Sequence, residues 1–211
     1  MFWKSKYERA RVLASADQAR SRGRVRAAVK GYLRVLEHEP EDHPVRAKVA
    51  PLLASLGKWE QSIRSFDQAA QGFLDKGFAP KAIAVWAVAA ETFPERVEYW
   101  ERIANEQVIR GRRADAVLAL LQGRAQLRKR RQRPLAALLL RQVLELQPGH
   151  IEAALDLAEL LRLDGVREEA KRLLASLLTR VGKGRMRRRV RFAQLRLEPT
   201  LRGALDWAFA R

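Results

Sequence analysis

The chain has 211 residues, of which 47% are hydrophobic and 31% are charged, and it contains no cysteine. This composition can support a buried core, and it excludes disulfide bonds and thiolate metal sites. The formal net charge of +18 would attract polyanions such as nucleic acid, anionic lipid or acidic protein.

The sequence indicates neither a signal peptide nor a membrane span. Its N-terminal residues lack the apolar segment of about 7–15 residues that signal peptides contain. The longest apolar run covers residues 82–90, whereas a membrane-spanning helix needs about 20 apolar residues. We therefore expect a soluble, cytoplasmic protein.

Helical spacing of apolar residues, interrupted by glycine and proline, recurs along the whole chain. About 12 helices are predicted, over residues 6–21, 26–37, 44–56, 59–76, 80–93, 96–110, 113–129, 134–147, 151–163, 166–181, 185–196 and 200–210. Pro51 lies inside the third of them and should kink it, because proline lacks a backbone donor. No stretch alternates with a period of two, so no strand is expected.

The pattern repeats every 54 residues, since residues 24–77 are followed without a gap by 78–131 and 132–185. Small residues, prolines and glycines fall in register at Ala28, Ala82 and Ala136, at Pro40, Pro94 and Pro148, at Ala50, Ala104 and Ala158, and at Gly57, Gly111 and Gly165. Large apolar residues also recur at this spacing, at Tyr32, Trp86 and Leu140, at Val49, Ile103 and Leu157, and at Phe66, Leu120 and Leu174. A fixed period of this kind is typical of helical-repeat proteins.

Part of each period resembles the tetratricopeptide repeat, a helix–turn–helix unit of 34 residues. That spacing separates Gly23 from Gly57 and Gly77 from Gly111. In the second period the matching residues are Trp100, Ile103, Ala104, Gly111, Ala116 and Leu120. The resemblance covers about residues 9–182. It implies a fold of stacked helix pairs in which the first helix of each pair lines a peptide-binding groove.

Each 34-residue pair is followed by 20 residues that hold one further helix, so the predicted unit has three helices. We expect an all-α, right-handed helical-repeat solenoid of the tetratricopeptide type. The solenoid would cover residues 1–182 and would begin with a leading helix at 6–21. A basic cap of two helices would follow over residues 183–211.

No motif for catalysis or for a cofactor is present. The sequence lacks a phosphate-binding glycine loop, a nucleophile elbow and a zinc-protease motif. Its three histidines, His38, His43 and His150, lie at predicted helix ends near prolines, where polar residues usually cap the helix or are solvated. We expect no enzymatic activity, no cofactor and no metal.

The resemblance implies groove-facing residues on three helices. Carried over position by position, they are Asp17, Arg20, Glu98, Glu101, Asn105, Val108, Glu152, Leu155, Glu159 and Arg162. Four of these are glutamates, whereas the tetratricopeptide proteins that bind acidic C-terminal peptides of chaperones use lysine, asparagine and arginine at such positions. The pattern predicts an acidic groove for a basic or mixed peptide. Ordinary solvated helix faces are the alternative interpretation.

Positive charge gathers at helix connections and forms two large clusters. The candidate polyanion-binding residues are Arg124, Arg128, Lys129, Arg130, Arg131 and Arg133 in one, and Arg180, Lys183, Arg185, Arg187, Arg188, Arg189 and Arg191 in the other. Arginine suits bidentate contacts with phosphate or carboxylate. Phe192 is the one aromatic residue beside these clusters, so base stacking has little support. A solvated edge is the competing interpretation.

These observations leave the function open between two main hypotheses. The first is a non-catalytic adaptor that binds a partner protein or peptide through its groove and basic edges. The alternative is a nucleic-acid-associated protein that contacts phosphates through its arginines. The sequence leaves the oligomeric state open.

The two ends of the chain carry apolar residues of their own. Phe2, Trp3 and Tyr7 could enter a membrane surface, a third and weaker hypothesis, or could cover the first helix. At the other end, an apolar stripe is predicted to cap the last helices, because terminal repeats must be covered to stay soluble. The stripe consists of Leu201, Ala204, Leu205 and Ala208, with Trp207 and Phe209 beside it.

Overall fold

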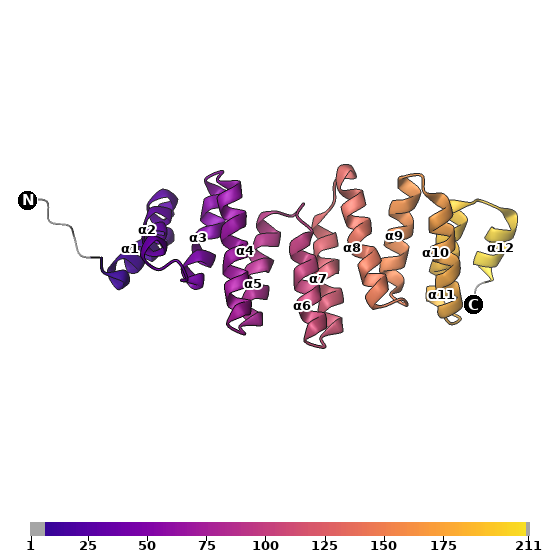
Figure 1. The fold of residues 1–211 in the computed structure, drawn as a ribbon. Coiled ribbons are helices and arrows are strands. Elements are labelled where there is room, and N and C mark those ends of the chain that lie inside the picture. Colours follow the sequence, from indigo (N-terminus) through magenta and orange to yellow (C-terminus); the bar gives the residue numbers. More distant parts are fainter. Residues whose placement is uncertain (1–6, 210–211) are drawn as a thin grey trace, which may run out of the picture. The chain divides into compact units, whose positions relative to one another are not determined.

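The computed structural model describes residues 7–209, and every regular element within them is helical (Figure 1). The elements are α1 (Arg9–Ser21), α2 (Val25–His38), α3 (His43–Ser55), α4 (Trp59–Asp75), α5 (Ala79–Thr92), α6 (Glu98–Ile109), α7 (Arg113–Gln126), the 3-10 turn η1 (Arg130–Gln132), α8 (Arg133–Leu146), α9 (Ile151–Leu163), α10 (Arg167–Arg180), α11 (Arg185–Leu197) and α12 (Leu201–Ala208). The twelve α-helices of this described range confirm the predicted all-α fold class.

The chain divides into two compact units. The first unit ends at Glu106 and the second begins at Gln107, so the division falls inside α6. The 54-residue unit and the boundary expected after residue 182 stay predictions.

In the first unit, each helix packs mainly against its neighbours in the chain. The packed pairs are α1 with α2, α2 with α3, α3 with α4, and α4 with α5. In addition, α3 packs against α5, two helices further on. Contacts between chain neighbours and between alternate helices are the pattern of stacked helix hairpins. Tyr32, Val35, Val49 and Leu53 lie in the core between α2 and α3 and are at most 1% exposed.

The second unit repeats this arrangement. Its packed pairs are α7 with α8, α8 with α9, α9 with α10, α10 with α11, and α11 with α12, together with the alternate pair α9 and α11. Leu139, Leu140, Val143 and Leu174 are fully buried within it. The contact between α9 and α11 places two helices side by side that α10 separates in the sequence.

The helix breaks expected at glycines are confirmed. Gly23, Gly57, Gly77, Gly111 and Gly165 each follow a helix and have φ between +68° and +79°, the left-handed region that residues with a Cβ atom avoid. At Gly57 the geometry is a Schellman motif, in which the Gly57 amide donates to the Ala54 carbonyl and the Lys58 amide to the Leu53 carbonyl, both at 2.9 Å.

Residues that recur at equivalent sequence positions are buried alike. The nine large apolar residues of the three register sets are at most 6% exposed, and Ala28, Ala82 and Ala136 are fully buried. A small side chain permits two helices to approach closely, and a large one on the neighbouring helix fills the remaining space. The sequence periodicity therefore indicated the core positions correctly.

The end of one helix differs from the sequence expectation, whereas the kink expected at Pro51 stays a prediction. The predicted end of the seventh helix at Lys129 is wrong, because α7 stops at Gln126. Leu127 leaves the helix and is 3% exposed, and the Lys129 amide then donates to Gln132 Oε1 at 2.9 Å, which opens η1. Burial of one leucine thus outweighs continuation of the helix. The helix α3 continues through Pro51 to Ser55.

A close contact between α3 and α4 makes Gly72 sensitive to substitution. A Cβ atom at Gly72 would lie 2.1 Å from the buried ring of His43. We expect Gly72→Ala to destabilise the chain by about 1–3 kcal/mol, the usual cost of overpacking a core, although alanine alone would favour the helix by up to about 1 kcal/mol. The midpoint of urea-induced unfolding measures the change.

The control for this substitution is Gly149→Ala, where no atom lies within 4 Å of the added Cβ. The midpoint of urea-induced unfolding of Gly149→Ala should equal that of the unchanged chain. Adding His43→Ala to Gly72→Ala should recover part of the loss, because the clashing ring is removed. If Gly72→Ala leaves the midpoint unchanged, the His43 ring does not pack on Gly72 as described.

Candidate functional site

A groove with a cavity volume of about 460 Å³ lies between α9, α11 and α12 of the second unit. We call it the α9–α11 groove. It is lined by Leu155, Ala158, Glu159 and Arg162 from α9, by Arg185, Arg188, Arg189, Phe192, Ala193, Arg196 and Leu197 from α11, and by Trp207 from α12. The groove thus contains residues from both sets of sequence candidates, the groove-facing positions and the arginines.

Helical periodicity explains why α11 presents these side chains together. Arg185, Arg188, Phe192 and Arg196 follow one another at spacings of three or four residues, which places them on one face of the helix. Val190 and Leu197 are the buried residues of α11. The helix holds six arginines and no acidic residue.

The floor of the groove is apolar. Ala158 and Leu197 are at most 5% exposed, and the ring of Phe192 lies against Trp207 with centroids 5.7 Å apart and the ring planes tilted by 46°. Phe192 itself is 46% exposed, so part of its ring is available to a ligand. Apolar walls with a few polar groups around them are typical of binding sites.

The carboxylates of α9 are paired with arginines, so the expected acidic groove is not formed here. Glu152 accepts hydrogen bonds from both terminal nitrogens of Arg189 on α11, with Nη2–Oε2 at 2.8 Å. Glu159 accepts from Arg162 on its own helix at 2.9 Å and from Arg196 on α11 at 3.3 Å. The paired arginines reverse the predicted sign of this surface.

The same ion pairs shift the titration of the two glutamates. The hydrogen bond from Arg189 lowers the pKa of Glu152, and the hydrogen bonds from Arg162 lower the pKa of Glu159. Both groups therefore stay ionised to a lower pH than an unpaired glutamate would.

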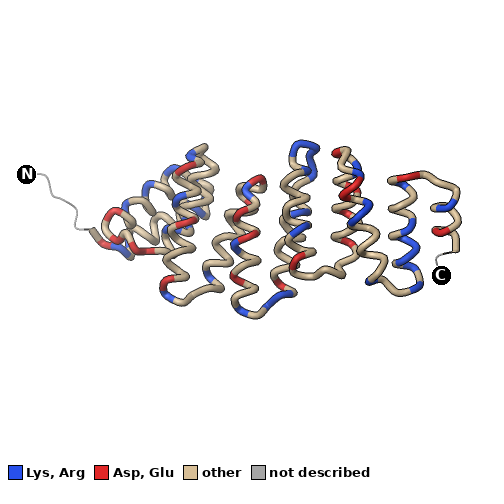
Figure 2. The backbone as a smooth tube through the Cα atoms, turned by 45° about the vertical axis from the view of Figure 1, so that its right-hand side comes forward, with Lys and Arg blue, Asp and Glu red and all other residues tan. Residues whose placement is uncertain are grey.

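Two arginines of the groove have no carboxylate partner among the described residues. Arg188 lies over the Trp207 ring, with its guanidinium carbon 4.9 Å from the ring centroid, and Arg185 stands exposed at the start of α11. Figure 2 shows the resulting run of basic residues along α11. An anionic group entering the groove would find these two guanidinium groups available.

The helix α12 borders the groove and packs against α11. It contains no buried residue. Leu201 is 89% exposed and Leu205 59%, so the apolar stripe does not cover the core as expected. Instead, Trp207 packs on α11, and Asp206 Oδ2 lies 3.7 Å from Arg191 Nη1.

The sequence candidates on α6 lie outside this groove. Glu98, Asn105 and Val108 are exposed and Glu101 is partly buried. None of the four lines the α9–α11 groove. They remain candidate contact residues.

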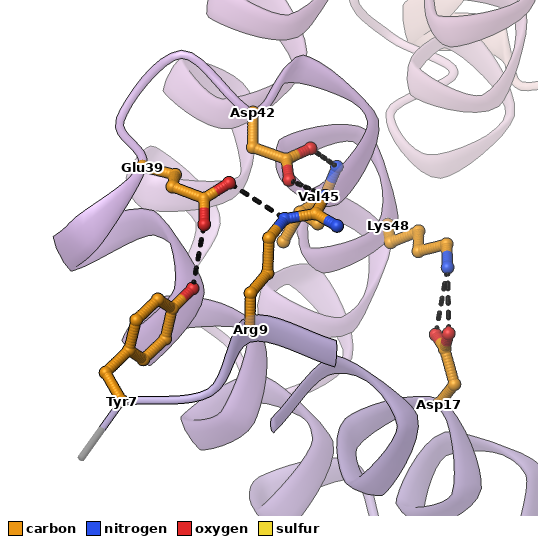
Figure 3. A network of polar contacts seen from close by, with 7 residues as sticks. All are labelled: Tyr7, Arg9, Asp17, Glu39, Asp42, Val45 and Lys48. Carbon is orange, nitrogen blue, oxygen red and sulfur yellow. Dashed lines mark hydrogen bonds and ion pairs between the residues drawn. The ribbon is translucent and has the colours of Figure 1, made fainter. Parts of the chain in front are cut away.

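Asp17, one of the two candidates on α1, belongs to a polar network of the first unit (Figure 3). Asp17 Oδ1 accepts a hydrogen bond from the Tyr32 hydroxyl at 2.6 Å, and both its oxygens accept from Lys48 Nζ at 3.0 Å. Arg20 is exposed one turn further along α1. Asp17 thereby ties α1 to α2 and α3, which is a structural role.

A second part of this network joins the start of α1 to the connection between α2 and α3 (Figure 3). The Tyr7 hydroxyl donates to Glu39 at 3.2 Å, and Arg9 pairs with Glu39 at 2.8 Å and with Asp42 at 2.5 Å. Asp42 also caps α3 by accepting from the Val45 amide at 3.0 Å. Tyr7 is therefore engaged within the protein, as the covering interpretation expects, whereas Phe2 and Trp3 lie outside the described residues.

The basic cluster between α7 and α8 is partly neutralised. Arg124 forms a two-point ion pair with Asp156 of α9 at 2.8 Å, and Arg133 pairs with Asp164 at 3.1 Å. Arg128, Lys129 and Arg130 are exposed in the connection, and Arg131 beside them is exposed too. Figure 2 shows this connection as a continuous basic segment.

The remaining basic candidates lie between α10 and α11. Arg187 donates to the carbonyls of Leu178 and Val181 at 3.1 Å and so caps the C-terminal end of α10. Arg180 and Lys183 are exposed, and Arg191 faces Asp206. This second cluster therefore divides between a structural cap and the groove.

Sequence reasoning missed six residues of the groove: Ala158, Phe192, Ala193, Arg196, Leu197 and Trp207. The spacing of Phe192 and Arg196 on the arginine-bearing face of α11 was the available signal. Nothing in the sequence indicated that α9 lies beside α11, because that contact skips a helix.

Among the described residues, no helix is long and apolar enough to span a membrane. In the same part of the chain, no group of three histidine, aspartate or glutamate side chains could hold a metal ion.

No protein-family model matches the sequence, and no curated protein matches it. Solved structures do match. The crystal structure of MamA protein is 14% identical over 81% of this chain and 90% of its own, with a TM-score of 0.35. A tetratricopeptide repeat protein from Parabacteroides merdae is 12% identical over 96% and 91%, also with a TM-score of 0.35.

The thermophilic tetratricopeptide protein TTC0263 from Thermus thermophilus is 18% identical over 96% of this chain and 98% of its own, with a TM-score of 0.29. At such low identities and TM-scores these likenesses carry no functional argument. The helix hairpins, the glycine-ended helices and the alternate-helix contacts define this chain as an all-α helical-repeat protein.

The Asp17 network predicts a pH-dependent contribution to stability. The hydrogen bond from Tyr32 lowers the pKa of Asp17 below its ordinary value, and burial raises the pKa of Tyr32 to about 12. A lowered carboxylate pKa gives stability that is present above the unfolded-state value and is lost as the pH falls through the folded-state value. We expect Asp17→Asn to cost about 1 kcal/mol at neutral pH, since the carboxylate is partly exposed.

The difference in the free energy of unfolding between Asp17→Asn and the unchanged chain should become smaller below about pH 4, because Asp17 is then increasingly protonated. Urea unfolding at a series of pH values measures it, with Glu37→Gln on α2 as a control that removes an exposed carboxylate. A stability difference that does not depend on pH would contradict the ionic role of Asp17.

Proposed function

We propose that the chain is a non-catalytic scaffold that binds a segment of a partner polypeptide in the α9–α11 groove. The observation that carries this proposal is the groove itself, an apolar floor of Ala158, Leu197 and Phe192 bordered by arginines from α9 and α11. A polypeptide offers both apolar side chains and polar backbone groups, and it can follow such a groove between helices.

The groove is better suited to a polypeptide than to nucleic acid. Single strands stack successive bases on several open aromatic faces. Here Arg188 covers part of Trp207, and Phe192, which lies against Trp207, leaves part of a single ring open. In the other basic cluster, Arg124 and Arg133 already pair with acidic side chains. Phosphate binding by the exposed residues of that cluster is the alternative, and it should be strongly weakened by salt.

Photo-crosslinking tests the proposal with the full chain. A benzophenone amino acid is placed at Ala193, which lines the groove, and in a separate variant at Gln122, an exposed position on α7. Each purified variant is irradiated in nuclease-treated lysate at moderate salt. We expect protease-sensitive crosslinked products at Ala193 that are absent at Gln122, because only the first position contacts a groove-bound segment.

Equal product patterns at the two positions would contradict a groove-specific partner. A product at Ala193 that appears only without nuclease would instead support the nucleic-acid alternative. Circular dichroism of both variants should show unchanged helix content, so that a missing product is not caused by misfolding.

A further inference from the structure

We infer that the α9–α11 groove selects an acidic segment with large apolar side chains, whose carboxylates pair with Arg185 and Arg188 while an apolar side chain packs on Phe192. This inference rests on the proposed function and names the chemistry of the partner. It is opposite in sign to the basic peptide that the glutamates of α9 suggest in the sequence.

The charge of the groove lining favours an acidic partner. Five arginines and one glutamate line the groove. Even with Glu152, which pairs with Arg189 beside it, the surface keeps three positive charges in excess. An acidic segment would be attracted to this surface, and a basic one would be repelled.

The glutamates of the groove are also poorly available to a basic partner. Glu159 already accepts hydrogen bonds from two arginines, and Glu152 from both terminal nitrogens of a third. A lysine or arginine of a ligand would have to displace these intramolecular donors. A carboxylate would instead meet Arg185 and Arg188, which have no carboxylate partner within the described residues.

The protein itself shows that α11 accepts this chemistry. On the neighbouring face of α11, Asp206 of α12 faces Arg191 while the next residue, Trp207, packs on Phe192 and under Arg188. A carboxylate next to a large apolar side chain is thus already bound by α11 within the chain. The groove offers the same residue types on its open side.

The spacing of the arginines sets the length of the partner segment. Arg185 and Arg196 stand at the two ends of the groove-facing side of α11, about 16 Å apart, because a helix rises 1.5 Å per residue. An acidic segment that spans this distance is about five residues long if extended or about three helical turns if helical. One isolated carboxylate would not use the whole groove.

Fluorescence anisotropy with three dye-labelled synthetic peptides tests the inference on the full chain. The first peptide alternates glutamates with leucine and tryptophan at helical spacing. In the second, every glutamate is replaced by lysine. The third keeps the glutamates but has alanine in place of leucine and tryptophan. We expect the first peptide to bind at least ~10-fold more tightly than either of the others.

Matched variants locate the binding. Arg185→Gln with Arg188→Gln should weaken binding of the first peptide at least ~10-fold. Arg128→Gln with Arg130→Gln removes the same charge from the connection between α7 and α8 and should change binding less than ~2-fold. Ala193→Trp should weaken binding too, because the added ring fills the groove without changing any charge.

Several outcomes would overturn the inference: equal or tighter binding of the lysine peptide, equal binding of the alanine peptide, or the same loss from both pairs of arginine substitutions. The last result would indicate general attraction to a basic protein. If none of the peptides binds while Ala193 still gives specific polypeptide crosslinks, the acidic specificity is wrong and the scaffold function stands. Thermal melts of the variants confirm that they are folded.

Discussion

The structure depends on one constraint: each helix can bury its apolar side only against helices adjacent in the chain and against the next but one. In both units, alanines lie where two helices approach closely. Large residues such as Tyr32, Trp86 and Leu140 fill the space beside them, so the apolar sides are buried. Because a core built this way is local, its faces between alternate helices stay open at the surface. The contact of α9 with α11 is such a place, and the groove forms along it.

Electrostatic pairing then decides what this open surface can bind. The three carboxylates of α9, on Glu152, Asp156 and Glu159, all pair with arginines, which come from α11, from α7 and from α9 itself. Glu152 and Glu159, which the sequence suggests as ligand-binding groups, pair with arginines of α11 in the folded chain. What remains for a ligand is the excess of arginine on α11, next to exposed aromatic surface. In the first unit Asp17 is likewise paired within the chain, because it accepts a hydrogen bond from Tyr32 and forms an ion pair with Lys48.

The structure places the sequence candidates for the site in different parts of the chain. The resemblance placed Leu155, Glu159 and Arg162 on the groove-facing side of α9, and in the structure these three residues line the α9–α11 groove. Arg185, Arg188 and Arg189 were grouped as a basic edge, and they line the same groove from the other side. Two separate sequence hypotheses thus describe the two walls of one site. The aromatic part of the site, from Phe192 and Trp207, requires the packing of α12 on α11.

The sequence by itself determined the helices, the helix ends that glycines mark and the identity of the core. Proline, glycine and apolar spacing act within a few residues of the chain, so their effects can be read locally. The breaks at glycines with left-handed φ and the buried register positions follow from such local rules. Only the tertiary structure decided the partner of each charge and the sign of the groove. Ion pairs such as Glu152 with Arg189 join residues 37 positions apart, and no local pattern specifies which arginine a glutamate will meet.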